Sequence, residues 1–142
     1  MRLEIYEERL IKEVQKDFTS AYPFLKIEFF KNGAVRQDRY LAKQKIDSQQ
    51  KLKYSWFWKK DKGCLEIEDS LSVLELENAF MDEFGLSAQV YRKSGNVWLE
   101  TTMTDNWTLK QQNDHGREIT VGIKTINEED DNDYELNRDA GH

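Results

Sequence analysis

The sequence predicts an α+β fold: an antiparallel sheet with helices on one face, ferredoxin-like or a variant of that layout. Apolar residues first recur at helical spacing and then alternate as in a strand, and this order occurs twice along the chain. The second occurrence follows the first by 62 residues, so that Phe80 and Phe84 repeat Phe18 and Tyr22. We therefore expect two units, each consisting of a helix and a hairpin.

Length and composition are those of one folded domain with a polar surface. The chain has 142 residues, of which 38% are hydrophobic and 34% charged, and it contains 4 Trp, 6 Tyr and 7 Phe. A chain of this length can bury a hydrophobic core, and this aromatic content argues against disorder. Residues 1–126 are expected to form one α+β domain. Residues 127–142 are acidic and nearly free of apolar side chains, which predicts a disordered tail.

The first half of the chain predicts one helix and three strands. An apolar stripe at helical spacing predicts a helix over residues 7–21. Alternating polarity predicts a strand over residues 24–30, followed by a turn. Residues 34–51 have few apolar anchors and are compatible with an irregular strand or a long loop. Residues 52–60 and 64–68 alternate again and are expected to pair as a hairpin.

The second half begins with a well-marked helix. Ser72 and Glu75 have capping-box spacing, an apolar stripe follows them, and Gly85 is expected to end the helix. Residues 87–92 and 96–102 then predict a hairpin around the turn at Lys93-Ser94-Gly95.

A third, short helix is expected after the second hairpin. Thr104 or Asp105 is predicted to cap it, and Gly116 to end it. Residues 117–126 alternate in polarity and predict a last strand.

Charge is distributed unevenly along the chain. Residues 1–63 carry 15 basic and 9 acidic residues, whereas residues 64–142 carry 6 and 18. The segment 31–62 has 10 basic and 3 acidic residues, and the tail 127–142 has one and 7. This asymmetry indicates either a basic patch for an anionic partner or two halves that neutralise each other. The second explanation needs no ligand.

The sequence offers no catalytic residue, metal ligand or cofactor motif that we would assign. It contains no G-x-G-x-x-G, P-loop, H-E-x-x-H or C-x-x-C pattern. The single cysteine, Cys64, cannot form an intramolecular disulfide, which favours a reducing, cytoplasmic setting. No stretch approaches the roughly 20 apolar residues of a membrane span, and no signal peptide is evident at the N-terminus.

The run KLKYSWFWKKDK combines aromatic and basic residues, as surfaces that bind single-stranded nucleic acids do. Its candidate residues for a polyanion site are Lys51, Lys53, Trp56, Lys59 and Lys60. The alternative is that Tyr54, Trp56 and Trp58 face the helices as core residues, which we favour because three exposed large aromatics would be unfavourable in water.

The stretch RKSGNVWLETTMTDNWTLKQQN is the other candidate for a binding surface. If Val97 and Leu99 pack on the helices, Trp98 lies on the outer face of the sheet, and such an aromatic, polar face suits a dimer or a protein partner. The alternative is that Trp98 only lies beside another strand. Trp107 is expected to pack against the third helix. The candidate binding residues of this stretch are Arg92, Lys93, Trp98, Glu100, Thr102, Asp105 and Trp107.

The runs AYPFLKIEFF, ELENAFMDEFGL, QVYRKSGNVWLETT and TDNWTLKQQN resemble a family of small stand-alone bacterial proteins. The resemblance extends over most of the chain to about residue 116 and does not include the basic segment or the acidic tail. It implies a bacterial, cytoplasmic protein and carries no implied activity, fold or ligand.

Three functions remain open at this point. The first is a non-enzymatic interaction or regulatory module that self-associates, as a dimer, through its sheet. The second is a binder of nucleic acid or another polyanion through residues 31–62. The third is an enzyme acting on a small polar ligand, which lacks an evident proton-transfer group.

Overall fold

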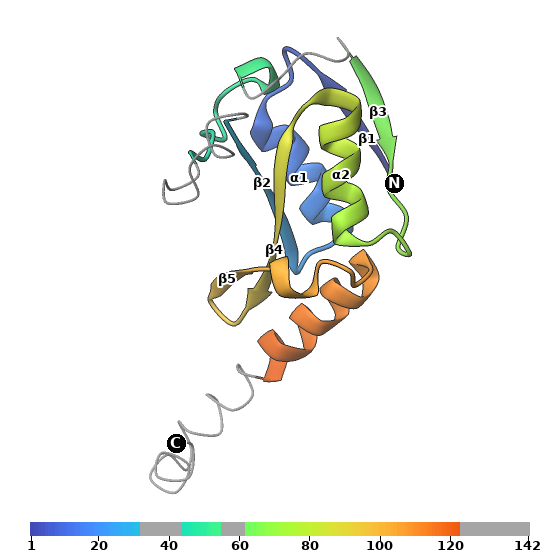
Figure 1. Cartoon of the computed structure of the whole chain (residues 1–142). Coiled ribbons are helices and arrows are strands. Elements are labelled where there is room, and N and C mark those ends of the chain that lie inside the picture. Colours follow the sequence, from blue (N-terminus) through green and yellow to red (C-terminus); the bar gives the residue numbers. More distant parts are fainter. Residues whose placement is uncertain (32–43, 55–61, 123–142) are drawn as a thin grey trace, which may run out of the picture.

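The computed structural model describes residues 1–31, 44–54 and 62–122, and it shows an α+β fold (Figure 1). The predicted fold class is therefore confirmed. The elements are, in chain order, β1 (Arg2–Tyr6), α1 (Ile11–Ala21), β2 (Leu25–Phe30), η1 (Leu52–Tyr54), β3 (Lys62–Glu66), α2 (Val73–Phe84), β4 (Ser87–Ser94), β5 (Val97–Glu100), η2 (Thr102–Thr104) and a C-terminal helix over residues 109–122.

The strands form two antiparallel sheets where the sequence predicts one. One sheet pairs β1 with β3, and the other has the order β2-β4-β5. In Figure 1 the helices α1 and α2 appear between the β1–β3 pair and the β2–β4 pair. Helices packed on antiparallel strands agree with the expected arrangement, but a ferredoxin-like layout is not confirmed.

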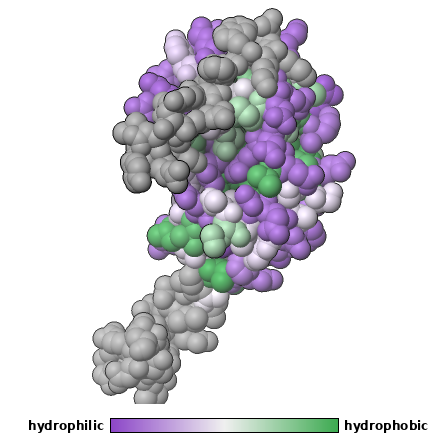
Figure 2. Space-filling model, in the orientation of Figure 1, coloured by the Kyte–Doolittle hydropathy of each residue, from purple (hydrophilic) through white to green (hydrophobic). Residues whose placement is uncertain are grey.

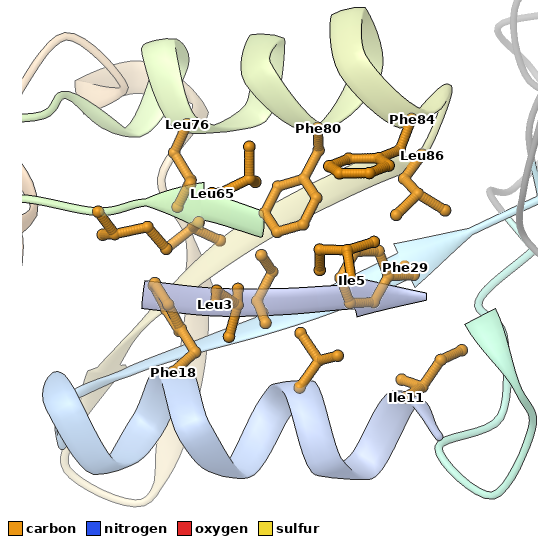
Figure 3. Close-up of a cluster of buried hydrophobic side chains, with 14 of the residues drawn as sticks. Leu3, Ile5, Ile11, Phe18, Phe29, Leu65, Leu76, Phe80, Phe84 and Leu86 are labelled. Carbon is orange, nitrogen blue, oxygen red and sulfur yellow. The ribbon is translucent and has the colours of Figure 1, made fainter. Parts of the chain in front are cut away.

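A single core lies between α1 and α2 (Figure 3). Each helix directs one apolar stripe toward it, and the strands supply alternate side chains. Phe29 of β2 and Phe80 of α2 meet edge to face, with ring centroids 5.4 Å apart. The largest fully buried side chains are Phe18, Phe29, Phe80, Phe84, Leu3, Ile5, Ile11, Leu25, Ile27, Leu52, Ile67 and Leu76.

The N-terminal segment corrects the predicted start of the first helix. Residues 2–6 form a strand, and α1 begins at Ile11 rather than at residue 7. Leu3 and Ile5 are fully buried while their neighbours are exposed, which is the pattern of a strand with one face covered. The charged neighbours of these two residues hide the strand in the sequence.

The first strand of the hairpin expected between residues 52–60 and 64–68 is wrong for residues 52–54, and residues 55–60 lie outside the described residues. Residues 52–54 form a short 3₁₀ helix, and β3 pairs with β1 instead. Tyr54, expected in the core, is 60% exposed. Trp56 and Trp58 lie outside the described residues, as do most of the turn after β2 and most of residues 34–51.

The second half follows the prediction closely up to the hairpin. In α2 the hydroxyl of Ser72 accepts from the Glu75 amide at 3.1 Å, and the Glu75 carboxylate accepts from the Ser72 amide at 3.0 Å. Gly85 ends α2 with φ of 68°, a conformation that glycine adopts without strain. The hairpin of β4 and β5 turns at Gly95, whose φ is 65°.

The C-terminal helix is longer than predicted and starts later. Thr108, rather than Thr104 or Asp105, caps it: its hydroxyl accepts from the Gln111 amide at 3.1 Å, and the Gln111 side chain accepts from the Thr108 amide at 2.9 Å. The helix passes through Gly116 and is still helical at residue 122. The strand predicted over 117–126 is therefore wrong for residues 117–122. Residues 123–142, including the predicted tail, lie outside the described residues.

Candidate interaction surface

The strand β5 forms one edge of the sheet β2-β4-β5. No further strand of the described residues pairs with it. Ser94 and Val97 flank the two-residue turn, so their backbones form two hydrogen bonds with each other. Along the hairpin, hydrogen-bonded residue pairs then alternate with pairs that are not hydrogen-bonded. Arg92 and Leu99 form the next bonded pair, which directs the backbone N–H and C=O of Trp98 away from β4 toward the free edge.

Exposed apolar side chains accompany this edge. Val97 is 55% exposed and Leu99 is 43% exposed, and Met103, just beyond the strand, is 94% exposed. Figure 2 shows a hydrophobic group at the position of β5. The sequence predicts Trp98 on the outer face on the condition that Val97 and Leu99 pack on the helices. The register puts these two residues on the face that carries the buried Leu25 and Val90, but about half of their surface is exposed.

The reason is the position of β5 at the end of the sheet. Leu99 lies opposite Arg92, and at this level the C-terminal helix packs on β4 through Gly116, where an added Cβ would lie 3.0 Å from Arg92 Cγ. Here the helix covers β4, while Val97 and Leu99 on the next strand keep about half of their surface in solvent.

The other face of the hairpin carries Trp98, which is half-buried rather than open to solvent. The ammonium of Lys26 lies 5.2 Å from the Trp98 ring and 5.4 Å from the Tyr91 ring, a cation–π arrangement with two aromatics. Lys93 lies opposite Trp98 in the register, and Glu100 lies opposite Tyr91. Burial raises the pKa of Tyr91, and the negative charge of Glu100 adds to that effect.

Lys26 and Tyr91 are the site residues that the sequence did not indicate. Each lies in a predicted strand whose polar and apolar residues alternate, which by itself does not indicate a binding residue. Their meeting with Trp98 depends on the β2–β4 register, in which Lys26 lies opposite Tyr91. No local signal carries this information, because the two strands are far apart in the sequence.

Arg92 and Trp107 lie together on the side of the C-terminal helix. The Arg92 guanidinium is 5.8 Å from the Trp107 ring and donates to Gln112 Oε1 at 2.7 Å. Trp107 also contacts the His115 ring edge to face at 5.4 Å. Partial burial lowers the pKa of Arg92. These contacts attach the C-terminal helix to the sheet, as expected for Trp107, so this group has a structural role of its own.

Thr102 and Asp105 belong to the segment that connects β5 to this helix. The exposed Thr102 has its hydroxyl 3.5 Å from the side-chain nitrogen of Gln89. The backbone carbonyl of Asp105 accepts from the Leu74 amide at 2.8 Å, near the start of α2. The seven predicted binding residues therefore divide among the outer face, the helix side and the connecting segment, and they do not form one pocket.

Two of the residues of the alternative polyanion site are engaged by a carboxylate. The ammonium groups of Lys51 and Lys53 lie 2.6 Å and 3.0 Å from the two oxygens of Glu8. These bonds hold the pKa of Glu8 below its ordinary value and that of Lys53 above it. Trp56, Lys59 and Lys60 lie outside the described residues.

No arrangement suited to catalysis stands out in the described part of the chain. Residues 1–31, 44–54 and 62–122 contain no group of three or more His, Cys, Asp or Glu side chains that could hold a metal ion. A depression of about 290 Å³ is lined by Trp107, Gln111, Asp114, His115 and Glu118. The His115 ring in it contacts Trp107, and no hydrogen bond or ion pair of the described residues joins it to a carboxylate.

Comparison with family models, curated proteins and solved structures finds no match to this chain. Within the described residues, no helix combines the length and the apolar character that crossing a membrane requires.

Proposed function

We propose that this protein is a non-enzymatic interaction module that self-associates through the edge of β5. One observation carries the proposal: β5 is an edge strand whose Trp98 backbone groups point outward, and the same strand exposes the apolar side chains of Val97 and Leu99. Edge strands with exposed apolar residues readily pair with another chain. A second copy of the same strand is the partner that fits best, because the strand matches itself.

The match follows from the geometry of antiparallel pairing. When two copies of β5 pair about a two-fold axis at Trp98, the two Trp98 residues exchange their outward backbone hydrogen bonds. Val97 of each copy then lies opposite Leu99 of the other, on the same face of the extended sheet. Glu100 lies opposite Asn96, so no two like charges face each other.

The expected affinity is modest. Burying a whole aliphatic side chain contributes about 1.5–3 kcal/mol, and Val97 and Leu99 are already about half buried in one chain. The pairing strand is also short, with four residues in each copy. We therefore expect a dimer that forms in the micromolar range and dissociates on dilution.

Sedimentation equilibrium of the full chain over a micromolar concentration series tests this. The native protein should be a concentration-dependent dimer, and Leu99→Glu should be monomeric. Because Leu99 is partly exposed, the variant should have the melting temperature of the native protein at dilutions where both are monomeric. Val121→Glu is the matched control, since Val121 is 52% exposed on the C-terminal helix, and it should still dimerise. A native protein that stays monomeric throughout the series contradicts the proposal.

Binding of a polyanion through the basic segment is the weaker alternative. Glu8 already neutralises part of the charge of Lys51 and Lys53. Binding of single-stranded DNA at low salt that is lost in Lys51→Glu, and retained in Lys12→Glu, would favour this alternative over self-association.

A further inference from the structure

The fold consists of two copies of one unit. The first copy comprises the described residues 1–31 and 44–54, and the second lies within residues 62–122, which also contain β5 and most of the C-terminal helix. Each runs strand, helix, strand and then a segment that returns to the start of its helix. Equivalent buried residues are 62 positions apart: Leu3 and Leu65, Ile5 and Ile67, Ile11 and Val73, Val14 and Leu76, Phe18 and Phe80, Tyr22 and Phe84.

The returning segments make the same backbone contacts in both copies. In the first, the Ile11 amide donates to the Gln50 carbonyl at 2.9 Å, close to the start of α1. In the second, the Val73 amide donates to the Trp107 carbonyl at 3.1 Å, in the same place on α2. Three more backbone hydrogen bonds correspond between the copies. The amides of Lys12 and Leu74 donate to the carbonyls of Ser48 and Asp105. Likewise the amides of Leu52 and Leu109 donate to Arg9 and Leu71, and those of Lys53 and Lys110 donate to Glu7 and Asp69.

Side chains on the two helices also take equivalent roles. Glu13 and Glu75 each accept a hydrogen bond from the backbone amide just before their helix, at 2.9 Å and 3.0 Å. Gln15 donates to the Ile27 carbonyl of β2 at 2.8 Å, and Glu77 accepts from the Val90 amide of β4 at 2.9 Å. The capping contacts repeat at a spacing of 62 residues, and the contact from the helix to the strand repeats with a shift of one residue on the strand.

The two copies are joined by pairing of equivalent strands. β1 pairs with β3, and β2 pairs with β4, both antiparallel. Antiparallel pairing of equivalent strands is the pattern of a two-fold symmetric dimer, in which the same surface is used on both sides. The helices α1 and α2 close the shared core from opposite sides (Figure 3). The contact between the units therefore has the form of a homodimer interface within one chain.

We infer that the surface with which each unit contacts the other can bind any copy of the unit, including one from a second chain. Two whole chains can therefore exchange units and form a dimer. In the exchanged dimer the first unit of one chain pairs with the second unit of the other. The contacts that the described residues make between the units are retained, and in the sequence the two units are joined by residues 55–61. Exchange of this kind is a low-cost route to a dimer, and concentration favours it. It does not use β5 and is independent of the proposed function.

The native cysteine offers a direct test in full chains. Glu4 of β1 lies directly opposite Cys64 of β3, and directly opposed residues of antiparallel strands are within disulfide range. Both positions are at least partly accessible, so substitution there leaves the core intact. A chain carrying Glu4→Cys and Cys64→Ser is unfolded together with the native chain, refolded at high protein concentration and oxidised. A disulfide between position 4 of one chain and Cys64 of the other requires exchanged units.

The expected result is a cross-linked pair of chains, formed several-fold more than with the control chain Val121→Cys, Cys64→Ser, and containing the 4–64 linkage by peptide mass. Glu4→Cys alone must close within one chain. If the 4–64 disulfide forms within the Glu4→Cys chain but the mixed chains give no more cross-linked product than the control, the exchange of units is excluded. If it fails to close, the β1–β3 register and the inference both fail. Leu99→Glu in both chains should leave the cross-link unchanged, which separates this outcome from failure of the β5 dimer.

Discussion

Arg92 and Gln112 join the sheet to the C-terminal helix through one hydrogen bond, from Arg92 Nη1 to Gln112 Oε1 at 2.7 Å. The Gln112 side chain is fully buried, and its Nε2 donates to the Thr104 carbonyl at 2.6 Å and to the Thr104 hydroxyl at 2.9 Å. Of the apolar side chains in the described part of this helix, only Leu109 is buried. The helix is therefore positioned chiefly by polar contacts, which require definite geometry.

Replacement of Gln112 by Leu should lower the free energy of unfolding by about 1–3 kcal/mol, because it leaves polar groups of Arg92 and Thr104 without their partner. Chemical denaturation measures the loss. Glu118→Leu, on the exposed side of the same helix, is the control and should change stability little. Equal stability of the two variants would contradict the assigned role of Gln112.

Gly116→Ala should destabilise the protein although alanine favours helix. An added Cβ would lie 3.0 Å from Arg92 Cγ and 3.2 Å from the Phe24 carbonyl oxygen, and the backbone cannot move aside without shifting the helix. Gly122→Ala meets nothing within 4 Å and should be neutral or stabilising by up to about 1 kcal/mol. Thermal unfolding of the two variants, compared side by side, tests the packing of the helix on Phe24 and β4.

Phe18→Ala and Phe80→Ala should destabilise the fold to a similar extent, by about 3–5 kcal/mol each. Both rings are fully buried, and they occupy equivalent positions in the two units. Urea titrations under identical conditions give the two values. A large difference between them would show that the two units contribute unequally to the core.

Glu75→Gln should alter the dependence of stability on pH. The hydrogen bond from the Ser72 backbone amide holds the pKa of Glu75 below its ordinary value of 4.5, and the Ser72 side chain adds to the effect. Because the pKa is lower in the folded state, the ionised carboxylate contributes stability above the ordinary value and loses it as the pH falls through the folded pKa.

Glutamine keeps the capping geometry but does not titrate. The stability of Glu75→Gln relative to the native protein should therefore rise as the pH is lowered below that value. Denaturation series at neutral and acidic pH measure the difference, and a difference independent of pH would show that Glu75 does not titrate with a lowered pKa.

The sequence alone determined the elements whose signals are local. The cap at Ser72, the stripe through Phe80 and the stop at Gly85 lie within one helix, and each acts on backbone groups a few residues away. The turn at Gly95 is equally local. The 62-residue spacing between the two helices was also visible in the sequence, although the strands that follow them are shifted by one residue.

Only the tertiary structure decided which strands pair and which faces are covered. β1 pairs with β3 some sixty residues later, so the contacts that stabilise Leu3 and Ile5 in a strand cannot be read from their neighbours. Likewise Val97 and Leu99 show the alternation of a half-buried strand, and they lie on the face that carries the buried Leu25, but a period of two does not say how far the helices extend over that face. The answer depends on β5 lying beyond the reach of the helices, at the edge where we place the contact with a second copy.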